Sequence, residues 1–347
     1  MNKRREIVFK LLFFFIATGL TLVVGEVAIR VISSKTLIYN IEMVKYAKAL
    51  KQPDPKGEVS HVHVPSRSAH LMGVDITLNS LGQRSRELGP KKPEARRVLV
   101  FGSSITMGWG VPADKVFTSV AEEKLNATKP FGTETTFEMV NSGIGNYNTY
   151  FQYKLFQNQY PVVKPDMVVI QYFISDVEPR SMGRNNWLLK HSFLADYLFD
   201  RFGHIQFKVS GDRKDLFTHY SDFYQNDNEA WKQTEQYLSS ILDTTRKDGV
   251  PFLVMVIPDI HDLSPGSPYR DLYAKMEAAF KKLGIPVVNT FDAFQKKFGD
   301  DVSKLWIQSD DPHPNAAGHA LMAETLSDYL IKADPLKLGK AAAPSAP

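Results

Sequence analysis

Hydroxyl, imidazole and carboxylate side chains stand in two short segments near opposite ends of this sequence. Ser103 and Ser104 directly follow the apolar run Val98–Phe101, which predicts a buried strand. Near the C-terminus, Asp310-Asp311-Pro312-His313 precedes an expected helix. A serine hydroxyl is a poor nucleophile until a base takes its proton, and an acid that orients the base completes a nucleophilic triad. The residue types therefore predict acyl-transfer chemistry at a serine.

Alternating strands and helices must bring these segments together. The apolar runs and helical patterns predict strands at Val98–Phe101, Phe137–Asn141, Met167–Phe173, Phe252–Ile257 and Val287–Asn289, and helices at Asp114–Asn126, Thr149–Tyr160, Glu229–Lys247, Tyr269–Leu283 and Asn315–Ala333. Such alternation indicates an α/β fold with three α/β/α layers around a central parallel five-stranded sheet.

Small and polar residues follow several of these strands. Ser104, Gly143-Ile144-Gly145, Ser175-Asp176 and Asp259-Ile260-His261 each come directly after an expected strand. Ligands of such sheets bind beyond the carboxyl ends of the strands. We therefore expect these residues to converge at one edge of the sheet.

Composition narrows the function classes. The chain has 347 residues, no cysteine and a net charge of only +4, with Lys and Arg scattered. The lack of cysteine excludes disulfides, thiolate metal sites and a cysteine nucleophile. The weak, dispersed charge argues against nucleic-acid binding. We expect no cofactor and no metal.

The N-terminus carries a membrane-targeting pattern. Lys3, Arg4 and Arg5 precede the mostly apolar segment Ile7–Val24, and positive charge before such a segment predicts an N-terminus inside and the remainder outside. Because no small-residue cleavage site is evident after Val24, an uncleaved signal anchor is favoured over a removed signal peptide.

Composition shifts divide the chain into four parts. We expect a signal-anchor transmembrane helix at 1–35, a lead-in segment without long helices at 36–95 that packs on the main domain, and the main domain at 96–334. Within it, the aromatic-rich residues 177–228 predict an insertion or lid. The Lys-, Ala- and Pro-rich residues 335–347 predict a disordered tail. His61 and His63, in the lead-in, are interpreted as polar surface residues.

Four blocks in order resemble the SGNH/GDSL hydrolase superfamily, in its membrane-anchored branch of exopolysaccharide-associated esterases and O-acyltransferases. The blocks are Gly102-Ser103-Ser104-Ile105-Thr106, Asn141-Ser142-Gly143-Ile144-Gly145-Asn146, Ser175-Asp176 and Asp310-Asp311-Pro312-His313-Pro314-Asn315. The resemblance covers residues from about 60 to 333 and implies a flavodoxin-like order of strands.

The resemblance implies roles for the residues of the first and last blocks. Ser104 is expected as the nucleophile, with Ser103 the alternative. His313 is expected as the base. The family places its acid three residues before the histidine, which favours Asp310 as the orienting acid over its rival Asp311.

The resemblance also implies donors for an oxyanion hole. These are the N–H of Ser104, a backbone N–H at Gly145 or Asn146, and the side chain of Ser175. Asn146 stands where the family has glycine, and Ser175 where it has asparagine; Asn148, Asn185 and Asn186 are alternative donors. Asp176 and His261 are expected as pocket residues.

Two functions of different classes remain open. The first is a serine esterase or O-acyltransferase that acts on acetylated exopolysaccharide or lipid-linked carbohydrate through an acyl-enzyme. The second is a weak or inactive carbohydrate-binding or assembly partner of an envelope polysaccharide machine. The branch implies a bacterial inner membrane location, a domain in the periplasm or outside, and a membrane acyltransferase or polysaccharide-export partner.

Overall fold

A computed structural model describes residues 3–180, 187–199, 201, 216–299, 301–308 and 311–339 of the chain. The chain divides into two units. One unit comprises Met1–Lys48 with Arg184–Arg213, and the other comprises Ala49–Gly183 with Lys214–Pro347. The second unit contains the sheet and both of the segments that the sequence singles out.

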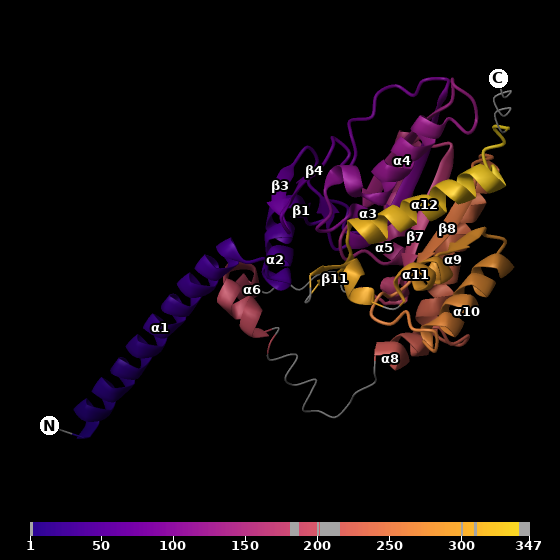
Figure 1. The fold of residues 1–347 in the computed structure, drawn as a ribbon. Helices are drawn as coiled ribbons and strands as arrows, with labels where there is room; N and C mark the ends of the chain where they lie inside the picture. Colours follow the sequence, from indigo (N-terminus) through magenta and orange to yellow (C-terminus); the bar gives the residue numbers. More distant parts are fainter. Residues whose placement is uncertain are drawn as a thin grey trace. The chain divides into compact units, whose positions relative to one another are not determined.

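Five parallel strands form the central sheet of the second unit (Figure 1). The strands are β5 (Ala95–Gly102), β6 (Thr136–Gly143), β7 (Met167–Phe173), β8 (Phe252–Ile257) and β9 (Val287–Asn289), in the order β6-β5-β7-β8-β9. Every neighbouring pair is parallel. This is the 2-1-3-4-5 order of flavodoxin-like doubly wound sheets, and it confirms the predicted fold class.

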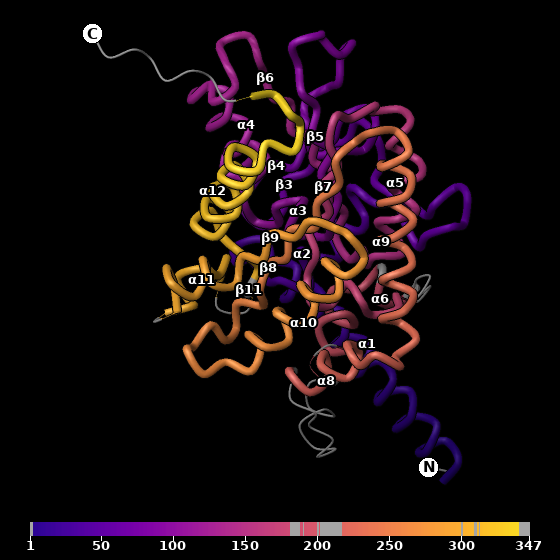
Figure 2. Tube along the Cα trace, turned by 90° about the vertical axis from the view of Figure 1, so that its right-hand side faces the viewer, coloured from indigo at the N-terminus to yellow at the C-terminus, as the bar shows by residue number. Residues whose placement is uncertain are grey.

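Helices cover both faces of the sheet, as Figure 2 shows. The helices α4 (Phe117–Thr128) and α12 (Ala316–Ala333) contact each other on one face, and α5 (Thr149–Val163) and α9 (Glu229–Lys247) contact each other on the other. The helix α10 (Tyr269–Lys282) lies beside α9, since the rings of Phe280 and Trp231 are 5.6 Å apart. Asn148, Asn228 and Asn315 cap α5, α9 and α12 with their side chains.

Short elements fill the connections after the strands. They are α3 (Ser104–Met107), η1 (Ala113–Lys115), η2 (Ile174–Val177), α11 (Phe291–Phe298), η3 (Val302–Leu305), β10 (Trp306–Gln308) and β11 (Asp311–Pro314). The strands β10 and β11 form an antiparallel hairpin apart from the main sheet. The sequence did not predict this hairpin or α11, because runs of three to eight residues carry too little periodicity.

The lead-in segment differs from its prediction at its start. We expected no long helix there, yet α2 spans Tyr39–Leu50. Two small hairpins follow, β1 (Lys51–Gln52) with β2 (Val62–His63) and β3 (Ser68–Leu71) with β4 (Val74–Thr77). From residue 49 on, the segment belongs to the same unit as the sheet. Its Arg84 guanidinium donates to the carbonyl oxygens of Met107, Gly108 and Val111, just after α3.

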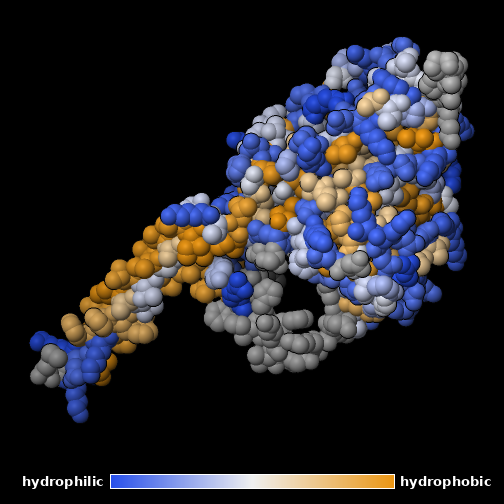
Figure 3. All heavy atoms as spheres, in the orientation of Figure 1, coloured by the Kyte–Doolittle hydropathy of each residue, from blue (hydrophilic) through white to orange (hydrophobic). Residues whose placement is uncertain are grey.

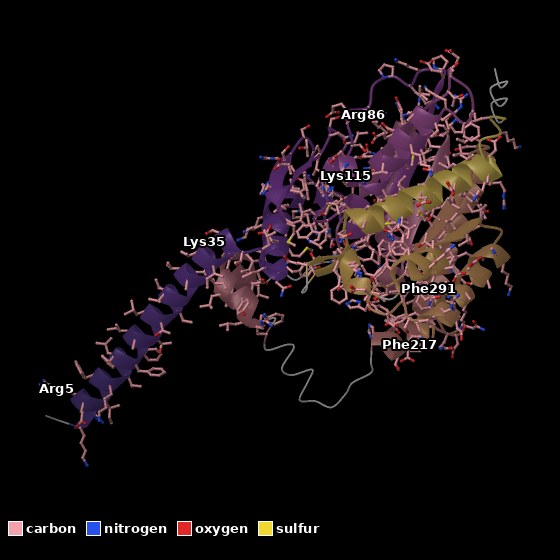
Figure 4. The ribbon with its side chains drawn as sticks, in the orientation of Figure 1. Arg5, Lys35, Arg86, Lys115, Phe217 and Phe291 are labelled. Atoms are coloured by element: carbon pink, nitrogen blue, oxygen red, sulfur yellow. The ribbon has the colours of Figure 1, made fainter. Side chains whose placement is uncertain are left out.

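The N-terminal helix α1 (Lys3–Lys35) is long and apolar enough to cross a membrane. Apolar side chains along it are exposed, and Figure 3 shows apolar atoms over most of its length. Arg5 and Lys35 lie near its two ends (Figure 4).

Two predicted segments fall partly outside the described residues. Of the expected insertion at 177–228, the structure describes α6 (Trp187–His191), residues 192–199 and 201, and α8 (Leu216–Phe223), but not residues 181–186, 200 or 202–215. The expectation of disorder from residue 335 is wrong for residues 335–339. The backbone N–H groups of Leu338 and Gly339 donate to the Asp334 carboxylate, and Leu336 and Leu338 pack on the core.

Candidate active site

Ser104 lies at the turn between β5 and α3. Its side chain is half-buried, whereas Ser103 is 8% exposed. Ser103 takes the N-cap position of α3 without a side-chain cap bond, so helix capping does not explain the serine pair. The turn admits only glycine at position 102, because an added Cβ would lie 2.1 Å from Thr106 Oγ1.

The Ser104 hydroxyl meets the imidazole of His313. Ser104 Oγ and His313 Nε2 are 2.8 Å apart, although 209 residues separate them along the chain. His313 stands on β11, and its side chain is 18% exposed. The structure thus brings together the two residues that the sequence predicted as nucleophile and base.

The carboxylate on this imidazole is Asp311, where the sequence favoured Asp310. Asp311 Oδ1 lies 2.5 Å from His313 Nδ1 and accepts the His313 backbone N–H at 3.1 Å. The physical reason is an Asx-type turn, in which an aspartate carboxylate folds back on the residue two positions later. Asp310 lies outside the described residues.

The hydrogen bonds determine which ring nitrogen carries the proton. An ionised carboxylate only accepts, so His313 Nδ1 donates to Asp311 and Nε2 presents a lone pair to the Ser104 hydroxyl. Asp311 is fully buried, and its Oδ2 accepts from Trp109 Nε1 at 2.9 Å. Sequence reasoning assigned no role to Trp109, because nothing in its spacing connects an indole after α3 to a carboxylate on β11.

The second block begins as the last three residues of β6 and continues from Ile144 as a loop next to the carboxyl end of β5. The Ile144 N–H donates to the Gly102 carbonyl oxygen at 3.1 Å. Asn146 is exposed and has φ of +70°, the left-handed conformation that glycine adopts most easily. Asn146 therefore keeps the backbone conformation expected of a glycine at this position.

The third block is Ser175-Asp176, and Ser175 was expected to donate its hydroxyl to the oxyanion. Ser175 Oγ accepts a hydrogen bond from Arg180 Nη2 at 3.2 Å, and the Ser175 hydroxyl is also hydrogen-bonded to Tyr220. The alternative donor Asn148 caps α5 and donates its Nδ2 to the Glu178 carbonyl oxygen at 2.8 Å. Asn185 and Asn186 lie outside the described residues.

Asp176 is buried beneath this block. Its Oδ2 accepts from Gln152 Nε2 at 3.0 Å and from the Phe173 N–H at 3.1 Å, while Oδ1 is one of the described buried atoms without a partner. Burial raises the pKa of Asp176 to about 7. Asp176 also lines a cavity of about 230 Å³ with Arg180 and residues of α5 and α9.

Replacing Asp176 with asparagine should change how stability depends on pH. The unfolded carboxyl ionises near its ordinary pKa of 3.8, while the folded one keeps its proton up to about 7, so this group lowers stability as pH rises from 4 to 7. We expect Asp176→Asn to raise Tm at pH 8 by about 5–10 °C, with the gain shrinking toward pH 4. Thermal unfolding across this range, with Asp114→Asn as an exposed control (70% exposed side chain), tests the expectation; an equal gain at both pH values would contradict it.

His261 forms a second aspartate–histidine pair at the end of β8. Its Nδ1 lies 2.6 Å from Asp259 Oδ1, which also accepts the His261 backbone N–H at 2.9 Å. The hydrogen bond that His261 donates to the Asp259 carboxylate raises the pKa of His261. The His261 side chain is 47% exposed, and its ring centroid is 5.9 Å from that of Trp306 on β10. Because Trp306 pairs with Pro314, His261 stands beside the hairpin that carries His313.

Comparison with known proteins finds similarity among solved structures alone; no family model and no curated protein matches the chain. One such structure is a two-domain esterase active on acetylated mannans (17% identity, TM-score 0.42), covering 72% of this chain and 52% of that one. Another is the acetyl xylan esterase AlAXEase (15% identity, TM-score 0.43; 67% and 99% covered). A third is a catalytic mutant of an acetylxylan esterase from Geobacillus stearothermophilus (17% identity, TM-score 0.43; 68% and 94% covered). The chain spans about half the length of the two-domain esterase.

Proposed function

We propose that this chain is a serine esterase of the SGNH type, with Ser104 as nucleophile, His313 as base and Asp311 as orienting acid. One observation carries the proposal: Ser104 Oγ lies 2.8 Å from His313 Nε2, and a buried carboxylate holds the other ring nitrogen. Enzymes that form a covalent intermediate typically hold a nucleophile, a base and an orienting group within hydrogen-bond distance of one another.

The acylation half-reaction follows from this arrangement. Ser104 Oγ attacks the ester carbonyl carbon while its proton passes to His313 Nε2, and Asp311 stabilises the imidazolium that forms. The tetrahedral intermediate then collapses. The bond to the leaving alcohol breaks, and His313 returns the proton to the alcohol oxygen, so Ser104 is left acylated.

Water completes the cycle by the same route in reverse. His313 takes a proton from water, the hydroxide adds to the acyl carbon, and the carboxylic acid leaves as Ser104 regains its proton. A sugar hydroxyl in place of water would make the same enzyme an O-acyltransferase, with no change in the residues involved.

Two backbone N–H groups are suited to bind the oxyanion. Ser104 is the first residue of α3, where a helical N–H has no acceptor within the helix. Asn146 keeps a glycine-like conformation on the adjoining loop. Because the Ser175 hydroxyl is engaged with both Arg180 and Tyr220, we propose no side-chain donor from the third block. Loss of one oxyanion donor costs about 100- to 1000-fold in kcat, so we expect a slow esterase.

The proposed substrates are acetyl esters of carbohydrate, near the membrane to which α1 would anchor the chain. The resemblance to exopolysaccharide-associated proteins implies this class, a periplasmic site of action and a polysaccharide-export or membrane acyltransferase partner. Trp306, on the same hairpin as His313, offers an aromatic ring of the kind that contacts sugars.

A fluorophosphonate probe tests the proposal directly on the full-length chain in detergent. The probe forms a stable bond only to an activated serine, so wild type is expected to label with one equivalent and Ser104→Ala not at all. Ser103→Ala is the matched control and is expected to label. Absence of labelling in folded wild type across pH 6 to 9 would refute the esterase and favour the non-catalytic carbohydrate-binding partner.

A further inference from the structure

The Gly145 carbonyl oxygen accepts hydrogen bonds from two side chains of the lead-in segment. Lys51 Nζ donates to it at 2.8 Å, and His61 Nε2 donates at 3.0 Å. Lys51 begins β1, and His61 directly precedes β2. Two polar side chains from a distant segment therefore hold one peptide group of the loop next to Ser104.

The His61 ring is fixed in one tautomer. Burial, reinforced by the Lys51 charge, lowers the pKa of His61 to about 3, so the imidazole is neutral at physiological pH. A carbonyl oxygen only accepts, hence Nε2 carries the hydrogen and Nδ1 accepts from Ser60 Oγ at 2.8 Å. The expectation that His61 and His63 are surface residues is wrong, because His61 is half-buried and His63 is 3% exposed.

Tyr147, on the same loop as Gly145, makes two further contacts with His61. Its hydroxyl donates to the His61 carbonyl oxygen at 2.6 Å, and its ring meets the His61 ring edge-on with centroids 5.3 Å apart. The loop and the lead-in are thus joined at the Gly145 oxygen, the His61 oxygen and the ring pair. Such a multiply connected contact holds its members in a single arrangement.

A peptide group is planar and trans, so its C=O and N–H bonds point in opposite directions. Fixing the Gly145 oxygen therefore fixes the direction of the Asn146 N–H. We find no acceptor for that N–H in the part of the chain that the structure describes. A non-glycine residue at φ of +70° is strained, and such strain persists where surrounding contacts over-determine the conformation.

We infer that Lys51 and His61 are positioning residues for the oxyanion, which act through the Gly145 carbonyl to aim the Asn146 N–H at the substrate oxygen. The inference rests on the proposed function, since it gives the Asn146 N–H a role only if Ser104 is acylated. Donors on the Gly145 oxygen also polarise the peptide and strengthen its N–H as a donor.

Substitutions that remove the two donors one at a time and together test this inference. Lys51→Met keeps a linear side chain without the ammonium, and His61→Phe keeps the ring beside Tyr147. We expect each single variant to lower kcat about tenfold and the double variant about 100-fold, the cost of a misplaced catalytic group. KM should stay close to wild type, because an oxyanion donor binds the transition state and not the ester.

Two controls separate positioning from folding. Lys56→Met removes an exposed lysine of the same segment and should leave kcat unchanged. His61→Gln offers an amide N–H to the same carbonyl and should recover most of the activity that His61→Phe loses. Lys51→Met should not lower the unfolding midpoint, because burial lowers the pKa of Lys51 to about 7, so the site disfavours the charged ammonium.

The outcomes distinguish this inference from the proposed function. A folded double variant that labels with fluorophosphonate to one equivalent but turns over slowly, with unchanged KM, supports it. Wild-type kcat in the double variant overturns it, and so does a fall in kcat that tracks a fall in the unfolding midpoint. Wild type that neither labels nor hydrolyses esters refutes the proposed function instead.

Discussion

Replacing Ser104 with alanine is expected to abolish ester hydrolysis, with kcat for an aryl acetate falling by on the order of 10⁶-fold. The hydroxyl supplies the electron pair that forms the acyl-enzyme, and it lies 2.8 Å from His313 Nε2. Loss of a methyl-sized polar group from a half-buried position leaves the fold intact, so the unfolding midpoint should stay near that of wild type.

The matched control for Ser104 is its neighbour. Ser103 stands one residue earlier, is more deeply buried and makes no side-chain cap bond, so Ser103→Ala is expected to keep most of the activity. Spectrophotometric assay of both variants at equal protein concentration is the measurement. Wild-type turnover by Ser104→Ala would show that Ser104 is not the nucleophile. A loss of activity confined to Ser103→Ala would show the same.

Replacing Asp311 with asparagine is expected to lower kcat about 10⁴-fold, the second largest effect we foresee. The carboxylate accepts from three donors: His313 Nδ1, the His313 N–H and Trp109 Nε1. An amide has one acceptor oxygen, so its NH₂ group must face either the indole N–H or the ring nitrogen. If it faces the ring, the imidazole adopts the wrong tautomer and Nε2 no longer accepts the serine proton.

The same substitution made at Asp310 decides between the two carboxylates. Asp310→Asn is expected to reduce kcat far less than Asp311→Asn. Measured stability must accompany the rates, because two donors facing each other in a buried site cost about 1–3 kcal/mol of unfolding free energy. The reverse ranking of the two variants, with both folded, would restore Asp310 as the orienting acid.

Some elements could be predicted closely because local chemistry determines them. The strands β7, β8 and β9 and the helix α9 have the predicted bounds. In β7 and β8 nearly every residue is apolar and buried, as in parallel sheets covered on both faces. The contact between Ser104 and His313 follows from the parallel strand order. In such a sheet the carboxyl ends of the strands and the connection after β9 lie at one edge.

Other parts of the site depend on contacts that no local pattern encodes. The choice of Asp311 depends on a turn of three residues, where a shift of one position decides which carboxylate reaches the ring. Lys51 and His61 bind a carbonyl oxygen more than eighty residues away. Every residue has a backbone carbonyl oxygen, so the amino-acid sequence does not indicate which of them binds a distant side chain. Only the folded structure shows these partners.

The spacing of Asp311 and His313 has a consequence for how the site could be regulated. Both residues stand on β11, and Asp311 Oδ1 accepts from the His313 ring and from the His313 backbone N–H. Acid and base therefore keep their mutual geometry when the hairpin moves. Ser104 stands on a different element, held by Arg84 through the carbonyls after α3. Two contacts therefore join the two halves: the 2.8 Å contact between Ser104 Oγ and His313 Nε2, and the hydrogen bond from Trp109 Nε1 to Asp311 Oδ2. A displacement of the β10–β11 hairpin that breaks both contacts would remove the base from the nucleophile while acid and base stay paired.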